Sequence, residues 1–138
     1  MKPAVLEHKG QKAKAIHPTE LVRRIQKGLP FSELETLRKD LGLPLDQLAE
    51  NLSISRATLH RRKIAGRLSP DESDKVIRFS RLLRQAIDLF GNIERGRAWL
   101  KFPQYGLGGA VPLDYAGTET GAREVENLLG RIKYSVYS

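Results

Sequence analysis

The residues best suited to chemistry in this sequence are cationic, and they gather in one short segment. Residues 52–67 contain five basic side chains and no acidic one: Arg56, Arg61, Arg62, Lys63 and Arg67. Cationic side chains without neighbouring carboxylates are suited to phosphate groups, and arginine can also form two hydrogen bonds with a guanine edge. The same segment fits a merely solvated surface, so charge alone leaves nucleic-acid binding open.

The charge of the whole chain is just as unevenly distributed. The 138 residues carry a formal net charge of +8: residues 1–69 hold 14 Lys/Arg against 7 Asp/Glu, and residues 70–138 hold 10 against 9. A hydrophobic content of 40% is enough for a folded core, which excludes a fully disordered chain. No uninterrupted apolar run long enough for a membrane helix occurs, no apolar block of signal-peptide length opens the chain, and cysteine is absent. We therefore expect a soluble, cytoplasmic protein without disulfides.

Patterns typical of enzymes are missing from the sequence. The three histidines, His8, His17 and His60, have no HExxH motif or paired acidic residues near them. The glycine-rich segment 106–109 lacks the preceding strand and the following Lys-Ser/Thr of a phosphate-binding loop, so a turn with positive φ and closely packed backbones is the better interpretation. We expect no enzymatic activity, no metal and no cofactor.

Helical periodicity accounts for most of the chain, and an all-α fold is predicted because no strand-like alternation competes with it. Residues 1–17 read as a flexible arm. Helices are expected over 18–27, 32–41, 45–52, 56–64, 70–90, 93–101, 112–115 and 121–133, with an irregular ending after them.

Helix starts are marked by polar residues at several of these positions. Capping boxes are predicted at residues 32–35 and 69–72, and Asn92 and Thr120 are expected to cap the helices that follow them. Within residues 70–90 a wide apolar stripe recurs at helical spacing: Val76, Phe79, Leu83, Ala86 and Phe90. The stripe suggests core packing plus a dimer partner.

Two short helices joined by a tight turn at residues 53–55 predict a helix-turn-helix. Ala49 is small where the helices would touch, and Leu48, Leu52, Ile54 and Leu59 would seal the corner. Two positions depart from the usual pattern, because Ser53 stands where glycine is common and Arg62 where an apolar residue is common. The alternative is a helical hairpin with a basic surface.

The second helix of this motif supplies the candidate DNA contacts. Ala57 is expected to lie beside Thr58 and Leu59 on the apolar side and also to belong to the turn offered to DNA. The residues expected to meet base edges are Ser55, Arg56, Ala57, His60 and Arg61. The residues expected to neutralise phosphates are Arg62, Lys63 and Arg67.

A longer set of motifs resembles a known family. The segment LAENLSISRATLHRRKIAGRLSPDESDKVIRFSRLL, followed by AIDLFGN, AWLKFP, GLGGAVPLDY and TETGAREVENLLGRIKYSVYS, looks like an antitoxin of the Xre/MbcA/ParS type. The resemblance covers about residue 18 to the end of the chain.

The resemblance implies a protein of two parts. Residues 18–85 would be an Xre-like DNA-binding domain that represses its own operon. Residues 86–138 would be a toxin-binding domain that covers the active-site entrance of a RES-domain toxin, an enzyme that consumes NAD⁺. The toxin-binding residues it implies are Arg131, Lys133, Tyr134, Val136, Tyr137 and Ser138. The residues it implies as scaffold are Trp99, Leu107, Gly108, Gly109, Pro112 and Leu113.

Two other functions remain open at this point. The chain could be a stand-alone dimeric repressor without a toxin partner. It could also be an inhibitor whose basic helix no longer binds DNA, because a fold does not guarantee its function.

Overall fold

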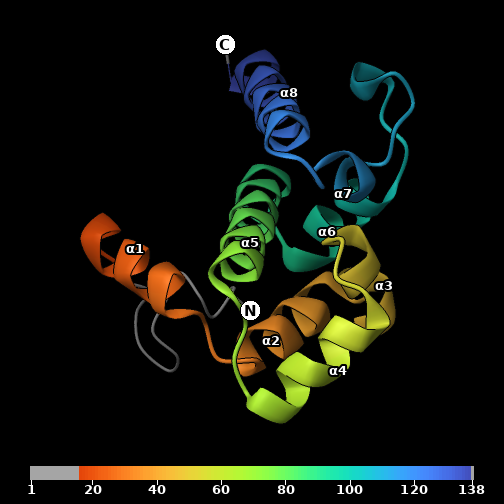
Figure 1. Cartoon of the computed structure of the whole chain (residues 1–138). Coiled ribbons are helices and arrows are strands. Elements are labelled where there is room, and N and C mark those ends of the chain that lie inside the picture. Colours follow the sequence, from red (N-terminus) through yellow and green to blue (C-terminus); the bar gives the residue numbers. More distant parts are fainter. Residues whose placement is uncertain (1–15, 138) are drawn as a thin grey trace. The chain divides into compact units, whose positions relative to one another are not determined.

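The computed structural model of the chain describes residues 16–137, with the side chains of residues 16–135 (Figure 1). Its helices are α1 (Pro18–Lys27), α2 (Ser32–Leu41), α3 (Leu45–Asn51), α4 (Arg56–Ala65), α5 (Pro70–Phe90), α6 (Ile93–Lys101), η2 (Tyr105–Leu107), α7 (Pro112–Tyr115) and α8 (Glu119–Tyr137). Within residues 16–137 no strand occurs, and an isolated bridge pairs Pro30 with Arg67. The predicted all-α fold is confirmed. The expected arm falls almost wholly on residues 1–15, outside the described part.

The chain divides into two compact units within α5. The N-terminal unit ends at Ser80 and the C-terminal unit begins at Arg81, so the first half of this helix belongs to one unit and the second half to the other. The predicted boundary at residues 85/86 lies in the same helix, a little further along it.

The N-terminal unit is built around leucines of α2 and α3 and the first half of α5. Its fully buried apolar side chains are Leu34, Leu37, Leu41, Leu48, Leu52, Val76 and Phe79. The segment before α2 pairs with the segment after α4, since Phe31 N–H donates to the Gly66 carbonyl (2.9 Å) and Leu68 N–H donates to the Leu29 carbonyl (2.9 Å). This pairing fixes both ends of the helix-turn-helix region.

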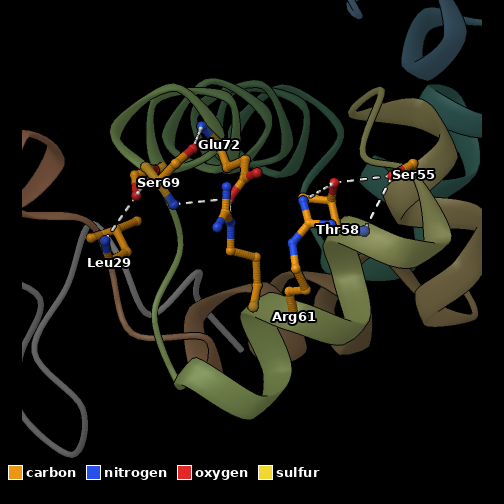
Figure 2. Close-up of polar contacts among 8 residues, drawn as sticks. Leu29, Ser55, Thr58, Arg61, Ser69 and Glu72 are labelled. Carbon is orange, nitrogen blue, oxygen red and sulfur yellow. Dashed lines mark hydrogen bonds and ion pairs between the residues drawn. The ribbon is translucent and has the colours of Figure 1, made fainter.

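The two predicted capping boxes turn out differently. At the start of α5 the Ser69 hydroxyl accepts from Glu72 N–H (3.2 Å), and the Glu72 carboxylate accepts from Ser69 N–H (2.8 Å), as predicted (Figure 2). At the start of α2 the prediction is wrong: Phe31 is the N-cap, no side chain caps the helix, and Ser32 is already helical. Pairing of Phe31 N–H with Gly66 shifts the helix start by one residue, away from the serine.

In the C-terminal unit the second half of α5 contacts α6 and α8, and α7 packs against α6 and α8. Its buried apolar side chains are Leu82, Leu83, Ala86, Leu100, Leu107, Leu113, Ala116, Ala122, Val125, Leu128 and Leu129. Asn92 caps α6 as predicted, through a bond from Arg95 N–H (2.8 Å). The predicted Thr120 cap is wrong, because α8 begins at Glu119 and the Thr118 hydroxyl accepts from Gly121 N–H (3.0 Å).

Glycines in this unit serve different purposes. Gly108 and Gly109 have φ of 66° and 88°, which confirms the predicted positive-φ turn. The predicted close packing is wrong there, because a Cβ at either glycine would meet nothing within 4 Å. Close packing occurs at Gly106, where a Cβ would lie 2.6 Å from Leu128, and at Gly121, where it would lie 1.7 Å from the Tyr115 carbonyl oxygen.

The apolar stripe of α5 is largely covered within the chain itself. Val76, Phe79, Leu83 and Ala86 are fully buried, and Phe90 is half-buried beside Trp99, with ring centroids 5.8 Å apart. No wide apolar surplus is therefore left on this helix to call for a dimer partner.

Candidate functional site

Helices α3 and α4 form the corner of a helix-turn-helix in the N-terminal unit. Ala49, Ile54 and Leu59 are buried where the two helices meet, as predicted. Ile54 N–H donates to the Ala49 carbonyl (2.8 Å), which closes the turn. Ser53 has φ of 60°, so it adopts the left-handed backbone conformation that glycine usually supplies at this position. The departure from the sequence pattern thus leaves the turn geometry intact.

The start of α4 is held by a small hydroxyl network (Figure 2). Ser55 is the N-cap, and its hydroxyl accepts from Thr58 N–H (3.2 Å) and donates to the Thr58 hydroxyl (3.0 Å). The Arg61 guanidinium donates to the same Thr58 oxygen (3.1 Å). This network fixes the exposed first turn of the helix and orients Arg61 along its surface.

Arg62 is turned toward the fold rather than toward solvent. Its guanidinium donates to the Glu72 carboxylate of the α5 capping box at 2.8 Å, and the Glu72 side chain is only 11% exposed. Burial by itself raises the pKa of Glu72, but hydrogen bonds from Arg62 and from Ser69 outweigh burial and lower that pKa overall. The hydrogen bond to Glu72 raises the pKa of Arg62. Arg62 therefore joins α4 to α5, which explains a cation where an apolar residue is common.

Arg67 is also engaged within the N-terminal unit. Its guanidinium donates to the Gly28 carbonyl, at the residue that ends α1. A Cβ at Gly28 would lie 2.3 Å from the Leu68 carbonyl oxygen, so the two chain segments approach closely here. Of the basic residues in 52–67, Arg62 and Arg67 thus make contacts that hold the fold.

The remaining predicted contacts share one exposed surface. Arg56, Ala57, His60, Arg61 and Lys63 are all exposed on α4. Arg56, His60 and Lys63 line a shallow hollow of about 330 Å³ with Leu45 and Asp46 of α3. The expectation that Ala57 lies on the apolar side with Leu59 is wrong, because only Leu59 of the two is buried. An exposed, cationic helix start of this kind can approach a polyanion.

The end of the chain differs from its prediction. The last helix continues to Tyr137 instead of ending near Lys133, so most of the expected irregular ending is helical. Within this extension the Ser135 hydroxyl donates to the Arg131 carbonyl four residues earlier (3.1 Å). Arg131, Lys133 and Tyr134 are exposed, Tyr134 at 78%. Ser138 and the side chains of Val136 and Tyr137 lie outside the described residues.

The C-terminal unit also exposes aromatic residues that the sequence analysis missed. Phe102 is 65% exposed and Tyr105 is 99% exposed, on the segment between α6 and α7. Hydrogen bonds hold this segment, because Gln104 N–H donates to the Ala110 carbonyl (3.0 Å) and the Gln104 amide donates to the Trp99 carbonyl (2.9 Å). The sequence offered one signal for this exposure: these aromatic residues have no apolar partners at helical spacing.

The residues expected as scaffold divide between core and surface. Leu107, Pro112 and Leu113 are buried, and Trp99 is half-buried. Gly108 and Gly109 are exposed in the turn.

Comparisons with known proteins assign both units. Residues 20–81 match the antitoxin Xre-like helix-turn-helix domain, and residues 85–134 match the antitoxin Xre/MbcA/ParS C-terminal toxin-binding domain. An Antitoxin Xre of Yersinia enterocolitica is 36% identical over 123 residues, which cover 87% of this chain and 82% of the relative. The chain belongs to the Xre antitoxin family. The predicted resemblance is thereby confirmed.

Two further relatives show how far the similarity extends. An Antitoxin Xre of Photorhabdus laumondii is 40% identical over 74 residues, covering 53% of this chain and 50% of the relative. A Sphingobium protein named Prs ADP-ribosylating antitoxin is 24% identical over 131 residues, covering 88% of this chain and 82% of the relative.

Other kinds of site were sought in the same residues. Among residues 16–137, no helix is both long and apolar enough to cross a membrane. His, Asp and Glu side chains in the described part of the chain form no group of three suited to a metal ion.

Proposed function

We propose that this Xre antitoxin represses its own operon through α4 and neutralises a RES-domain toxin encoded beside it. The toxin would consume NAD⁺, and the C-terminal end of α8 would cover the entrance to its active site. The antitoxin itself would be no enzyme and would need no cofactor. Both partners, operator DNA and toxin, would be met in the cytoplasm.

The exposed cationic surface of α4 carries the DNA part of the proposal. Arg56, His60, Arg61 and Lys63 are exposed on a helix whose start is fixed by the Ser55 cap, and α4 itself contains no acidic residue. In a helix-turn-helix the N-terminal part of the second helix meets base edges, so Ser55, Arg56 and Ala57 would lie nearest the bases. Lys63 would neutralise phosphate. Arg62 and Arg67 would contribute by holding α4 in place, with Arg67 also near enough to the surface to meet the backbone of DNA.

The toxin part of the proposal is carried by the match of residues 85–134 to a toxin-binding domain. The exposed end of α8 offers two cations and an aromatic ring, Arg131, Lys133 and Tyr134, on one helical extension. Val136, Tyr137 and Ser138 would follow them into the toxin. The name of the Sphingobium relative joins this family to ADP-ribosylation, a reaction that uses NAD⁺, and this supports an NAD⁺-consuming partner.

A homodimer is part of the proposal, for a reason different from the apolar stripe of α5. Helix-turn-helix proteins commonly bind paired half-sites as dimers, so two copies would read one operator. Sedimentation equilibrium of the full chain tests this, and a monomer at all concentrations up to the operator-saturating one would contradict it.

Operator binding is tested with arginine substitutions on α4. Arg56→Ala and Arg61→Ala should each weaken binding to the chain's own promoter by about 1–3 kcal/mol, the range for a lost contact to a base edge. Arg123→Ala, which removes an exposed arginine from α8 in the other unit, is the control and should leave operator affinity unchanged. Unchanged affinity in both α4 variants would show that another surface meets DNA.

Neutralisation is tested in cells that express the adjoining reading frame. Intracellular NAD⁺ should collapse with that protein alone and recover when the antitoxin is co-expressed. Tyr137→Ala combined with removal of Ser138 should weaken recovery and leave operator affinity intact. A harmless neighbour would favour the second candidate, a stand-alone dimeric repressor, which the exposed basic face of α4 also supports.

A further inference from the structure

A groove lies between the last turns of α5 and the C-terminal half of α8 in the C-terminal unit. Its volume is about 330 Å³. The residues that line it come from both helices: Gln85, Asp88, Leu89, Glu126, Leu129, Gly130 and Lys133. All of them lie within residues 85–134, the part that matches a toxin-binding domain.

Gly130 is the first observation that favours binding of another molecule in this groove. It lies in the interior of the 19-residue helix α8, where glycine is the poorest helix former apart from proline. Packing within the chain gives no reason for it, because a Cβ added at Gly130 would meet nothing within 4 Å. A glycine with open space above it allows the chain of another molecule to approach the helix closely.

Gln85 is the second such observation. Its amide nitrogen donates to the Glu126 carboxylate (3.2 Å), while its Oε1 is buried without a hydrogen-bond partner. Buried acceptors in folded proteins nearly always have a donor, so this oxygen, on a side chain that lines the groove, is an acceptor for a molecule that enters the groove.

The residues that line the groove also indicate which kind of segment could supply that donor. Leu89 and Leu129 give the groove an apolar part, with Leu129 buried at 4%. Asp88 and Glu126 are the acidic residues of the lining and Lys133 is its basic residue, while the Arg81 guanidinium lies 3.5 Å from Glu126, so the charges at the groove balance. A segment that offers an apolar side chain beside a hydrogen-bond donor fits this lining.

We propose that the α5–α8 groove binds such a segment of the cognate toxin, next to the end of α8, with Lys133 belonging to both contacts. The toxin segment would lie across Gly130, place its apolar side chain against Leu89 and Leu129, and donate a hydrogen bond to Gln85 Oε1. This inference rests on the proposed neutralisation of a toxin, since it assigns that partner a second contact.

The test fills the groove from the antitoxin side. Gly130→Leu adds a side chain where the structure shows open space and also favours helix, so the variant should fold at least as well as the original chain. Asn127→Leu adds the same side chain at an exposed α8 position outside the groove and serves as the control. Each full-length variant is titrated calorimetrically into the purified protein of the adjoining reading frame, with thermal unfolding measured alongside.

The proposal expects Gly130→Leu to weaken toxin binding by at least tenfold and Asn127→Leu to stay within twofold. Gly130→Ala adds a smaller side chain, so its loss of toxin affinity should lie between those of the other two variants. Gln85→Leu should bind the toxin at least fivefold more weakly than the original chain. Binding of Gly130→Leu equal to that of the original chain would overturn the proposal. A change in the oligomeric state of free Gly130→Leu would also overturn it, because the groove would then belong to a second copy. If the original chain itself fails to bind, the proposed function fails rather than the groove alone.

Discussion

Helices α4 and α8 are both candidate binding surfaces, and they are built in opposite ways. On α4 the inward cation Arg62 is paired with Glu72, and the outward cations stand on a capped, hydrogen-bonded helix start. In the C-terminal unit, by contrast, α8 has open space at Gly130, and the α5 side chain Gln85, which lines the same groove, has a buried acceptor without a partner. A surface that binds a polyanion needs exposed charge on a rigid support, whereas a surface that binds protein gains most from pockets that a partner fills and dries.

The largest expected effect distinguishes the two glycines of α8, because an added Cβ would clash at Gly121 and would meet open space at Gly130. Gly121→Val would place a side chain against the Tyr115 carbonyl oxygen, only 1.7 Å from an ideal Cβ, and should cost about 3 kcal/mol or more in the free energy of unfolding. Gly130→Ala should instead add about 0.8–1 kcal/mol, because it replaces an unhindered helical glycine. Chemical denaturation measures both.

Gly121→Val also tests whether the two units bind their partners independently of each other. Gly121→Val should abolish toxin binding and keep operator binding, since α4 lies in the other unit. Loss of both activities together would show that the C-terminal unit is needed to fold the N-terminal one.

A smaller effect is expected at the two serines that share a capping-box pattern. Ser69→Ala removes a hydroxyl that caps α5 and should cost about 0.5–2 kcal/mol. Ser32→Ala removes a hydroxyl that makes no cap, so it should change the free energy of unfolding by less than about 0.5 kcal/mol. Equal losses from the two substitutions would contradict the assignment of caps. Because α5 contributes to both units, Ser69→Ala should weaken operator and toxin binding near the unfolding temperature.

The smallest effects depend on pH and distinguish two glutamates of the N-terminal unit. The pKa of Glu72 is lowered from 4.5, so its ionised form stabilises the fold above that pH, and this contribution is lost as pH falls through the lowered value. The pKa of Glu33 is raised from 4.5, chiefly by burial, with Arg24 opposing and Asp40 adding to the shift. Its contribution is therefore present below pH 4.5 and lost as pH rises through the raised value.

Glutamine substitutions should reveal these opposite signs. Glu72→Gln should destabilise the protein at pH 7, and the deficit should shrink as pH falls below 4.5 through the lowered pKa. Glu33→Gln should stabilise it at pH 7, because the buried carboxylate has an oxygen without a hydrogen-bond partner, and the gain should be lost once pH falls below 4.5. Denaturation curves across this range measure both, and gains or losses of the same sign would contradict the account.

Local sequence patterns predicted the helices and the corner of the helix-turn-helix, because periodic leucines and small residues decide them. Patterns could not distinguish Ser69 from Ser32, since pairing of Phe31 with Gly66, far along the chain, moves the start of α2. They also grouped Arg62 with the phosphate contacts, because its partner Glu72 comes from another helix.

Features of the C-terminal unit were harder to predict. The length of α8 was underestimated because serine and β-branched valine in its last residues have low helix propensity. Gly130 reads as an ordinary helical glycine until the space above it is known, and the unpartnered oxygen of Gln85 appears only once α5 and α8 pack.

The measurement that tests the comparison most directly is the salt dependence of the two affinities in one full-length preparation. Operator affinity should fall steeply, with a slope of log affinity against log salt steeper than about −3, because each phosphate contact releases counterions. Affinity for the toxin should fall much less steeply over the same range, because the hydrogen bonds and apolar contacts of the groove are little screened by salt. Equal slopes for DNA and toxin would contradict the account that α4 binds through charge and the C-terminal unit through shape.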